Sequence, residues 1–180
     1  MTITSKAFSK SRQRGSDEQA TVAKNAALCG DVQLHPSCRI LARAVLRGEG
    51  ACVVIGAGST VQSDTVLHAD PGFPLHVERN VTIGHGAILV GCTIREGTQV
   101  GMQTVIETGV VVGRNCVITP GAYLKKGRVF PDNSLIVGSP AQVMRTLKPA
   151  PAAAAPAAPA APRPQADAAP PTRRLEAALC

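Results

Sequence analysis

Histidine and cysteine are the residues of this chain with the clearest potential for chemistry. His68, His85 and Cys92 follow one another in the middle of the sequence. Imidazole and thiolate are preferred zinc ligands, and a catalytic zinc keeps three protein ligands and an open position for water. This stretch therefore contains the donor types of a zinc site, although a small buried thiol is the commoner role for a cysteine. The remaining histidines, His35 and His76, lie beside turn residues, where we expect surface positions.

A six-residue repeat of apolar residues indicates the elements that position these side chains. Because six is even, a short strand returns the same side inward at each repeat, and Gly, Asn or Asp between the repeats supply corners. The repeat predicts a parallel β-helix. Its uninterrupted series is Ile94, Val100, Ile106, Val112, Ile118, Leu124, Phe130 and Ile136, and shorter series are Leu34, Ile40, Leu46 and Ile55, Val61, Leu67.

Two irregularities interrupt the repeat, and both flank the histidines. One is an insert from His68 to about Leu75, in which residues 70–74 (DPGFP) indicate a rigid turn. The other is a five-residue step from Leu89 to Ile94. A solenoid usually departs from its repeat where a loop has a function or where a partner packs.

Composition and charge are compatible with one folded unit and exclude some functions. Of the 180 residues, 44% are hydrophobic and only 2% aromatic, so small aliphatic side chains must build the core. The net charge is +7, but residues 20–144 contain ten Lys or Arg against eight Asp or Glu, so most of the excess lies at the two ends. Without aromatic platforms or a groove-reading helix, this pattern does not predict nucleic-acid binding. The longest apolar run has five residues, Ala51–Ile55, so we expect membrane attachment only through partners.

The composition also predicts the boundaries along the chain. Residues 1–27 form a basic N-terminal arm, and residues 28–139 form the β-helix. Residues 140–148 begin a C-terminal α-helix. Residues 149–180 form an Ala/Pro-rich tail, which favours extended conformations and ends in a short helical segment. The six cysteines form no CxxC pair, which is typical of free thiols in a reducing compartment.

The stretch HADPGFPLHVERNVTIGHGAILVGC, from His68 to Cys92, resembles the zinc-binding core of the gamma class of carbonic anhydrases. Residues 46–49 (LRGE) resemble that family's LRGD, with Glu49 in place of Asp, and residues 61–64 (VQSD) stand where the family has IQD. Residues 138–141 (GSPA) resemble its closing segment. The resemblance covers roughly residues 28–147 and implies a left-handed β-helix that assembles as a trimer.

In this family the zinc lies between neighbouring subunits. The resemblance implies that one subunit provides the ligands at the positions of His68 and Val90, and its neighbour provides the ligand at His85. Valine has no lone pair, so this chain alone lacks a zinc set. His85 could still complete a site shared with an intact paralogous subunit. The resemblance further implies that Arg47 and Glu49 pair across the subunit interface and that Gln62 lies close to the site.

These observations predict a non-catalytic, structural subunit of a heterotrimer of gamma carbonic anhydrase-like paralogues. The setting that the resemblance implies is the matrix side of the mitochondrial inner membrane, on the membrane arm of respiratory complex I; a cytoplasmic location is the alternative. A second hypothesis is CO2 hydration at a shared or Cys92-completed zinc site, with Gln62 orienting the zinc-bound hydroxide. A third is a hexapeptide acyltransferase, which would need a catalytic base and a groove for the acyl carrier.

Overall fold

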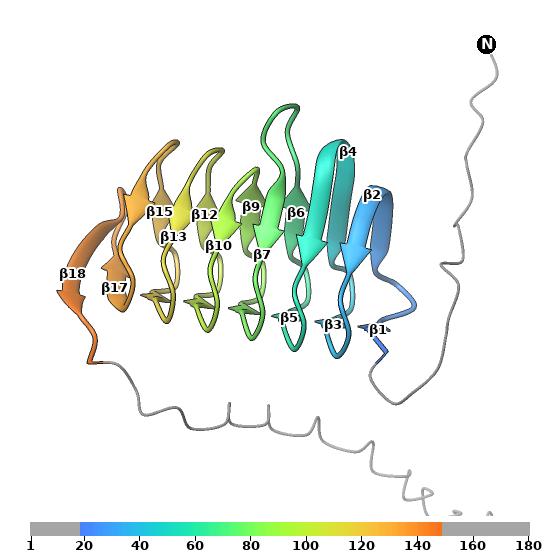
Figure 1. Cartoon of the computed structure of the whole chain (residues 1–180), viewed down its shortest axis with the longest axis horizontal. Helices are drawn as coiled ribbons and strands as arrows, with labels where there is room; N and C mark the ends of the chain where they lie inside the picture. Colours follow the sequence, from blue (N-terminus) through green and yellow to red (C-terminus); the bar gives the residue numbers. More distant parts are fainter. Residues whose placement is uncertain (1–18, 149–180) are drawn as a thin grey trace, which may run out of the picture.

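The computed structural model describes residues 19–148, which form one parallel β-helix whose coils stack from one end of the molecule to the other (Figure 1). The predictions for residues 1–18 and 149–180 lie outside the described residues. Each coil contributes short strands to three faces. The first face consists of β1 (Thr21–Val22), β3 (Arg39–Ile40), β5 (Thr60–Val61), β8 (Thr82–Ile83), β11 (Gln99–Val100), β14 (Val117–Ile118), β17 (Ser134–Val137) and β18 (Gln142–Thr146).

The second and third faces are joined by two long strands, β2 (Ala27–Leu34) and β4 (Val45–Ile55), which pair in parallel. The N-terminal part of β4 pairs with β6 on the second face, and its C-terminal part pairs with β7 on the third. The second face continues through β6 (Val66–His68), β9 (Ile88–Val90), β12 (Val105–Ile106) and β15 (Tyr123–Leu124), and the third through β7 (Leu75–Val77), β10 (Thr93–Ile94), β13 (Val111–Val112) and β16 (Val129–Phe130).

The hexad positions form the core, as the sequence predicted. Every member of the series from Ile94 to Ile136 is at most 4% exposed, and Ile40, Leu46, Ile55, Val61 and Leu67 are fully buried. Only Leu34, in the first complete coil, is half-buried. The predicted fold class, an all-β solenoid of hexapeptide repeats consistent with a left-handed β-helix, is therefore confirmed.

The corners repeat with the same six-residue period. One residue in each corner has a positive φ. Glycine adopts this conformation without a Cβ penalty, and asparagine tolerates it better than most residues do. Gln103, with φ of 54°, is the non-glycine, non-asparagine member of the regular series. The full series is Gly97, Gln103, Gly109, Asn115, Gly121, Gly127 and Asn133.

The predicted C-terminal helix at residues 140–148 is wrong, because residues 142–146 form strand β18. This strand runs antiparallel to β17, with Ser134 opposite Thr146 and Val137 opposite Gln142. Pairing with β17 satisfies backbone groups at the end of the sheet that a helix would leave open. In the part of the chain that the structure describes, no helix is long and apolar enough to cross a membrane.

In the structure the β-helix begins earlier in the chain than predicted, and the two irregularities of the repeat are a loop and a corner. Strand β1 pairs with β3, so the β-helix begins within the segment predicted as an arm, before residue 28. The predicted insert is present as the loop of residues 69–74, which projects between β6 and β7 (Figure 1). The short step before Ile94 corresponds to a corner at Gly91, where φ is +45°.

Candidate functional site

His68 and His85 lie at opposite edges of the second face. His68 ends β6, where it pairs in register with Arg47 of β4 and Val90 of β9. His85 is exposed in the corner that precedes β9. Val90 is five positions after His85 in the sequence, and the turn at His85 and Gly86 lies between the corner and strand β9. Among residues 19–148 no three His, Cys, Asp or Glu side chains are grouped so that they could hold a metal ion.

Val90 stands directly beside His68 on the outer surface of the sheet. Neighbouring strands lie about 4.8 Å apart, so side chains in register on one face are within contact distance. Val90 is half-buried and has no donor atom. The residues of this chain therefore do not fit the zinc site that the family implies.

Asp70 is a neighbour of His68 that the sequence pattern did not indicate. Nε2 of His68 lies 3.2 Å from Oδ1 of Asp70, and Nδ1 of His68 is buried without a hydrogen-bond partner. The other oxygen of Asp70 accepts a hydrogen bond of 2.8 Å from the Thr108 hydroxyl. The Asp70-Pro71 sequence indicated only a turn, and no signal in the sequence linked it to Thr108, two coils further along the helix.

The loop of residues 69–74 packs against later corners of the β-helix. A Cβ at Gly91 would lie 2.7 Å from Phe73 Cβ and 2.9 Å from the Phe73 carbonyl oxygen, so the loop requires glycine here. The ammonium group of Lys126 lies 5.9 Å from the centroid of the Phe73 ring. These contacts hold the loop beside His68.

Cys92 is in the core and does not replace the missing histidine. Its side chain is 1% exposed, and burial raises the pKa of its thiol to about 12. Zinc binds the thiolate, and this environment disfavours the thiolate. The structure therefore favours the packing role for Cys92.

His85 lies near a charged pair formed by residues of the two preceding coils. Arg43 donates two hydrogen bonds, of 2.6 and 2.7 Å, to the carboxylate of Asp64. This hydrogen bonding, with smaller charge effects from Arg43 and His85, holds the pKa of the Asp64 carboxyl below its ordinary value. The sequence does not indicate this pair, because Arg43 and Asp64 are 21 positions apart and meet only where successive coils stack. The backbone carbonyl of His85 accepts a hydrogen bond from the Gln103 amide.

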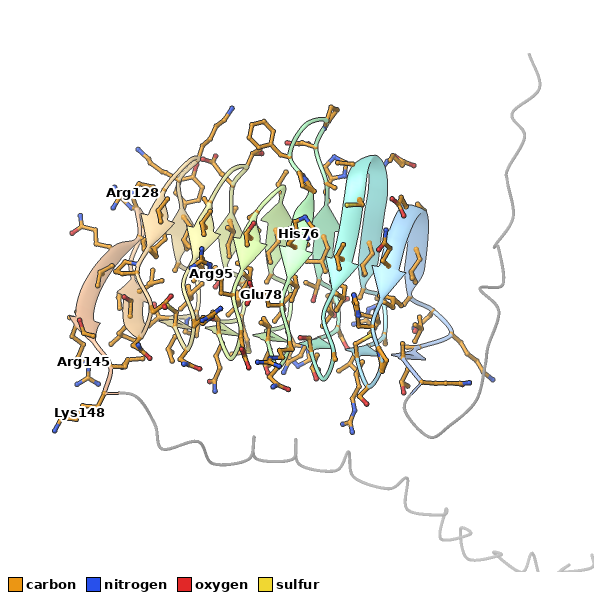
Figure 2. The ribbon with its side chains drawn as sticks, viewed as in Figure 1. His76, Glu78, Arg95, Arg128, Arg145 and Lys148 are labelled. Carbon is orange, nitrogen blue, oxygen red and sulfur yellow. The ribbon has the colours of Figure 1, made fainter. Side chains whose placement is uncertain are left out.

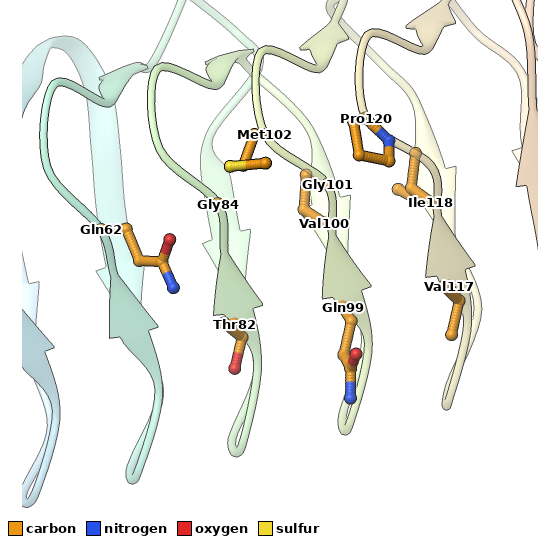
Figure 3. A pocket seen from close by; sticks show the side chains of 10 residues that line it. All are labelled: Gln62, Thr82, Gly84, Gln99, Val100, Gly101, Met102, Val117, Ile118 and Pro120. Carbon is orange, nitrogen blue, oxygen red and sulfur yellow. The ribbon is translucent and has the colours of Figure 1, made fainter. Parts of the chain in front are cut away.

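Gln62 lies in the same corner as His85, one coil earlier, and lines a shallow groove on the first face (Figure 3). The groove has a volume of about 390 Å³ and runs over β8, β11 and β14. Its lining contains no titratable side chain, so it offers no base for acyl transfer. Besides Gln62, the lining residues that project side chains into it include Thr82, Gln99, Met102, Val117 and Pro120.

Arg47 and Glu49 form an ion pair within one chain. Arg47 Nη2 lies 2.9 Å from Glu49 Oε2, and both side chains are about half exposed. The resemblance implied a pair across the subunit interface. The intrachain pair arises because the two residues are two positions apart on β4 and therefore project from the same side of the strand.

Comparisons with known proteins agree with this architecture. The family model described as "Bacterial transferase hexapeptide (six repeats)" matches residues 91–126. A solved hexapeptide transferase family protein from Anaplasma phagocytophilum is 30% identical with a TM-score of 0.70, over 74% of this chain and 78% of that chain. The chain is thus a hexapeptide-repeat β-helix.

Two curated relatives define the family more closely. A protein of Methanocaldococcus jannaschii named "Probable carbonic anhydrase" is 36% identical over 126 residues, which is 70% of this chain and 79% of the relative. "Gamma carbonic anhydrase 2, mitochondrial" of Arabidopsis thaliana is 32% identical over 137 residues, 73% of this chain. The chain spans about half, 49%, of this Arabidopsis relative's length. The chain belongs to the gamma carbonic anhydrase-like family of hexapeptide-repeat proteins.

Proposed function

We propose that this chain is a non-catalytic, structural member of the gamma carbonic anhydrase-like family that assembles with paralogous subunits. The observation that carries the proposal is the register of β6 and β9, which sets Val90 beside His68. A zinc ion on this face would have only one imidazole from this chain. The buried thiol of Cys92 does not supply a substitute.

Assembly is supported by an apolar row on the outer surface of the second face. The members of the row are paired in register, and Ile88 is 41% exposed although it is a large aliphatic residue. Burying such a row against another subunit is favourable by about 25 cal/mol for each Å² of apolar surface. The row consists of Val45, Val66, Ile88 and Val105.

The apolar row lies between the two histidines, and this arrangement makes the chain asymmetric as a partner. At one edge it exposes His85 with an available imidazole, and at the other edge it presents His68 with Val90. We propose that His85 completes a zinc site whose other two ligands come from an intact paralogue. In such a mixed trimer this chain contributes a ligand and an interface, while turnover depends on its partner.

A complementation experiment tests whether His85 can complete a zinc site whose other two ligands come from a neighbouring subunit. The double variant Val90→His/His85→Ala keeps His68 and restores the third position but lacks the ligand given to the neighbour. We expect this variant alone and the wild-type chain alone to bind little zinc. Co-expressed and purified as mixed trimers through two different affinity tags, they should bind zinc, as measured by mass spectrometry of the metal.

The matched control replaces the wild-type partner with His85→Ala. Mixed trimers of that pair contain no residue at position 85 that can bind zinc and should be as metal-poor as the separate chains. Equal zinc content in both mixtures would contradict a role for His85. Failure of the chains to form mixed trimers at all would contradict self-association of this chain through the apolar row.

We further propose that the chain acts on the matrix side of the mitochondrial inner membrane, within the membrane arm of respiratory complex I. The support is the Arabidopsis relative, whose name places it in mitochondria, and the basic character of residues 1–18, with four Lys or Arg against two acidic residues. Gentle detergent extraction followed by mass spectrometry of the co-purifying chains tests this location. Recovery of the chain with paralogues but without complex I subunits would restrict the proposal to the heterotrimer.

A further inference from the structure

The charges of the β-helix are distributed unevenly between its two ends. Residues 19–106 contain six Lys or Arg and six Asp or Glu, whereas residues 107–148 contain six Lys or Arg and only two acidic residues. We call these six cations, together with strand β18, the basic end. The cations are Arg114, Lys125, Lys126, Arg128, Arg145 and Lys148, and all are exposed.

The two halves also differ in how their charges are paired. Arg43, Arg47 and Arg79 each form an ion pair with a carboxylate in the first half. Within residues 19–148, no cation of the basic end forms an ion pair, although the Glu107 carboxylate interacts electrostatically with Lys125 and Lys126. Figure 2 shows Arg128, Arg145 and Lys148 projecting outward around the last coil, while Glu78 and Arg95 lie on the middle coils. The basic end therefore has a positive field that the rest of the β-helix lacks.

The basic end carries an open strand edge as well as charge. Strand β18 is the last strand of its sheet and pairs only with β17 among the described strands. All five of its residues are exposed, and Met144 is 71% exposed and Val143 41% exposed. An exposed edge strand has a row of unpaired backbone donors and acceptors to which another extended chain can add.

Charge decides which extended chain fits this edge. A second copy of the basic end would bring Arg145 and Lys148 against their own equivalents, and like charges opposite one another disfavour pairing. Residues 1–18 and 149–180 of this chain both have more Lys and Arg than Asp and Glu, so neither is complementary. A bilayer could meet the cations but has no backbone groups to pair with β18.

We infer that the basic end of the β-helix binds an extended acidic segment of another protein, which adds as a strand to the free edge of β18. Backbone hydrogen bonds to β18 give the affinity, and carboxylates facing Arg145 and Lys148 give the selectivity. Strand β18 belongs to the first face, whereas the apolar row proposed to contact another subunit lies on the second. Binding at β18 gives the chain a docking function that does not depend on zinc.

The test measures binding of short fluorescent peptides to the full-length chain by fluorescence anisotropy. The first probe alternates Glu and Val; the second has Lys in place of Glu; the third is the Glu/Val peptide N-methylated at alternate residues, which removes backbone donors and keeps the charge. We expect the first probe to bind, with slowed hydrogen exchange at the amides of Gln142–Thr146. We expect binding of the second and third probes to be at least about tenfold weaker.

Two charge-reversal variants separate local from general electrostatics. Arg145→Glu/Lys148→Glu should weaken the acidic peptide at least about tenfold, whereas Arg39→Glu/Arg95→Glu, which changes net charge equally at exposed sites away from the basic end, should change binding less than about twofold. Circular dichroism verifies that each variant is folded.

Four outcomes would overturn the inference. They are no binding of the Glu/Val peptide, equal binding of its N-methylated form, equal weakening by both charge reversals, and binding to phosphatidylserine vesicles without binding to the peptide. The last would assign the basic end to a membrane surface. Loss of zinc complementation in the mixed-trimer experiment leaves this inference intact, because the two experiments probe different surfaces.

Discussion

The later coils of the β-helix are regular, whereas the earlier coils carry the inserted loop and the histidines. In the regular part Thr93 pairs with Val111 and Val111 with Val129, at a constant spacing. In the interrupted part the spacing changes, because Val54 pairs with His76 and His76 with Thr93. Yet both parts have fully buried hexad positions. The difference teaches that the inward residues specify the coil, while insertions at the corners are free to build the surroundings of a site.

The largest effect should come from breaking the core of the regular part. Val112 is fully buried, so Val112→Asp would place a lone carboxyl among aliphatic side chains. The cost is on the order of 5 kcal/mol, comparable to the net stability of a small domain. We expect no folded protein by circular dichroism. The control Gln99→Asp, at an exposed position on β11, should fold normally; if both variants fold, the core has been assigned to the wrong side of the strands.

High pH should weaken the interrupted part through Cys92. Burial raises the pKa of the Cys92 thiol from its ordinary 9.0 to about 12, so between these values the unfolded chain loses a proton that the folded chain retains. The stability that the protonated Cys92 thiol contributes is therefore fully present below pH 9, and the free energy of unfolding falls as pH rises above 9. The loss approaches about 1.4 kcal/mol per pH unit for one thiol.

Urea titrations of wild type and Cys92→Ala between pH 8 and pH 11 measure this contribution. The slope of the unfolding free energy against pH should be shallower in Cys92→Ala than in wild type, by up to about 1.4 kcal/mol per pH unit. A residual slope is expected in Cys92→Ala, because burial also raises the pKa of Cys38 to about 11. Identical slopes in the two proteins would mean that Cys92 is not shielded from solvent.

A smaller effect should distinguish the inserted loop from the corners it covers. Gly91→Ala combines a positive φ with a clash against Phe73, whereas Gly121→Ala has a positive φ and nothing within 4 Å. Backbone strain alone costs about 1 kcal/mol, and displacement of the loop should add about 1–2 kcal/mol at Gly91. Urea denaturation gives both values. Equal losses would show that the loop does not pack on this corner.

The sequence predicted the repeat because each hexad position obeys one local rule, an inward aliphatic residue on every sixth position. The prediction from the sequence failed at the C-terminal end, where residues 142–146 form a strand that pairs with β17. Strand formation there depends on the open edge of the sheet rather than on local conformational preference. The link between His68, Asp70 and Thr108 was also beyond sequence reasoning. It depends on how the loop of residues 69–74 folds back across two later coils, and no periodicity encodes that path.

We propose, as the central claim, that Val90 prevents this chain from binding zinc with its own residues. The decisive measurement is the zinc content and CO2 hydration rate of purified wild-type chain beside those of Val90→His. We predict that the wild-type assembly contains far less than one zinc per subunit and hydrates CO2 no faster than buffer, and that Val90→His raises the metal content. Stoichiometric zinc with turnover in the wild-type chain would contradict the non-catalytic function, and an unchanged metal content in Val90→His would contradict the central role of this position.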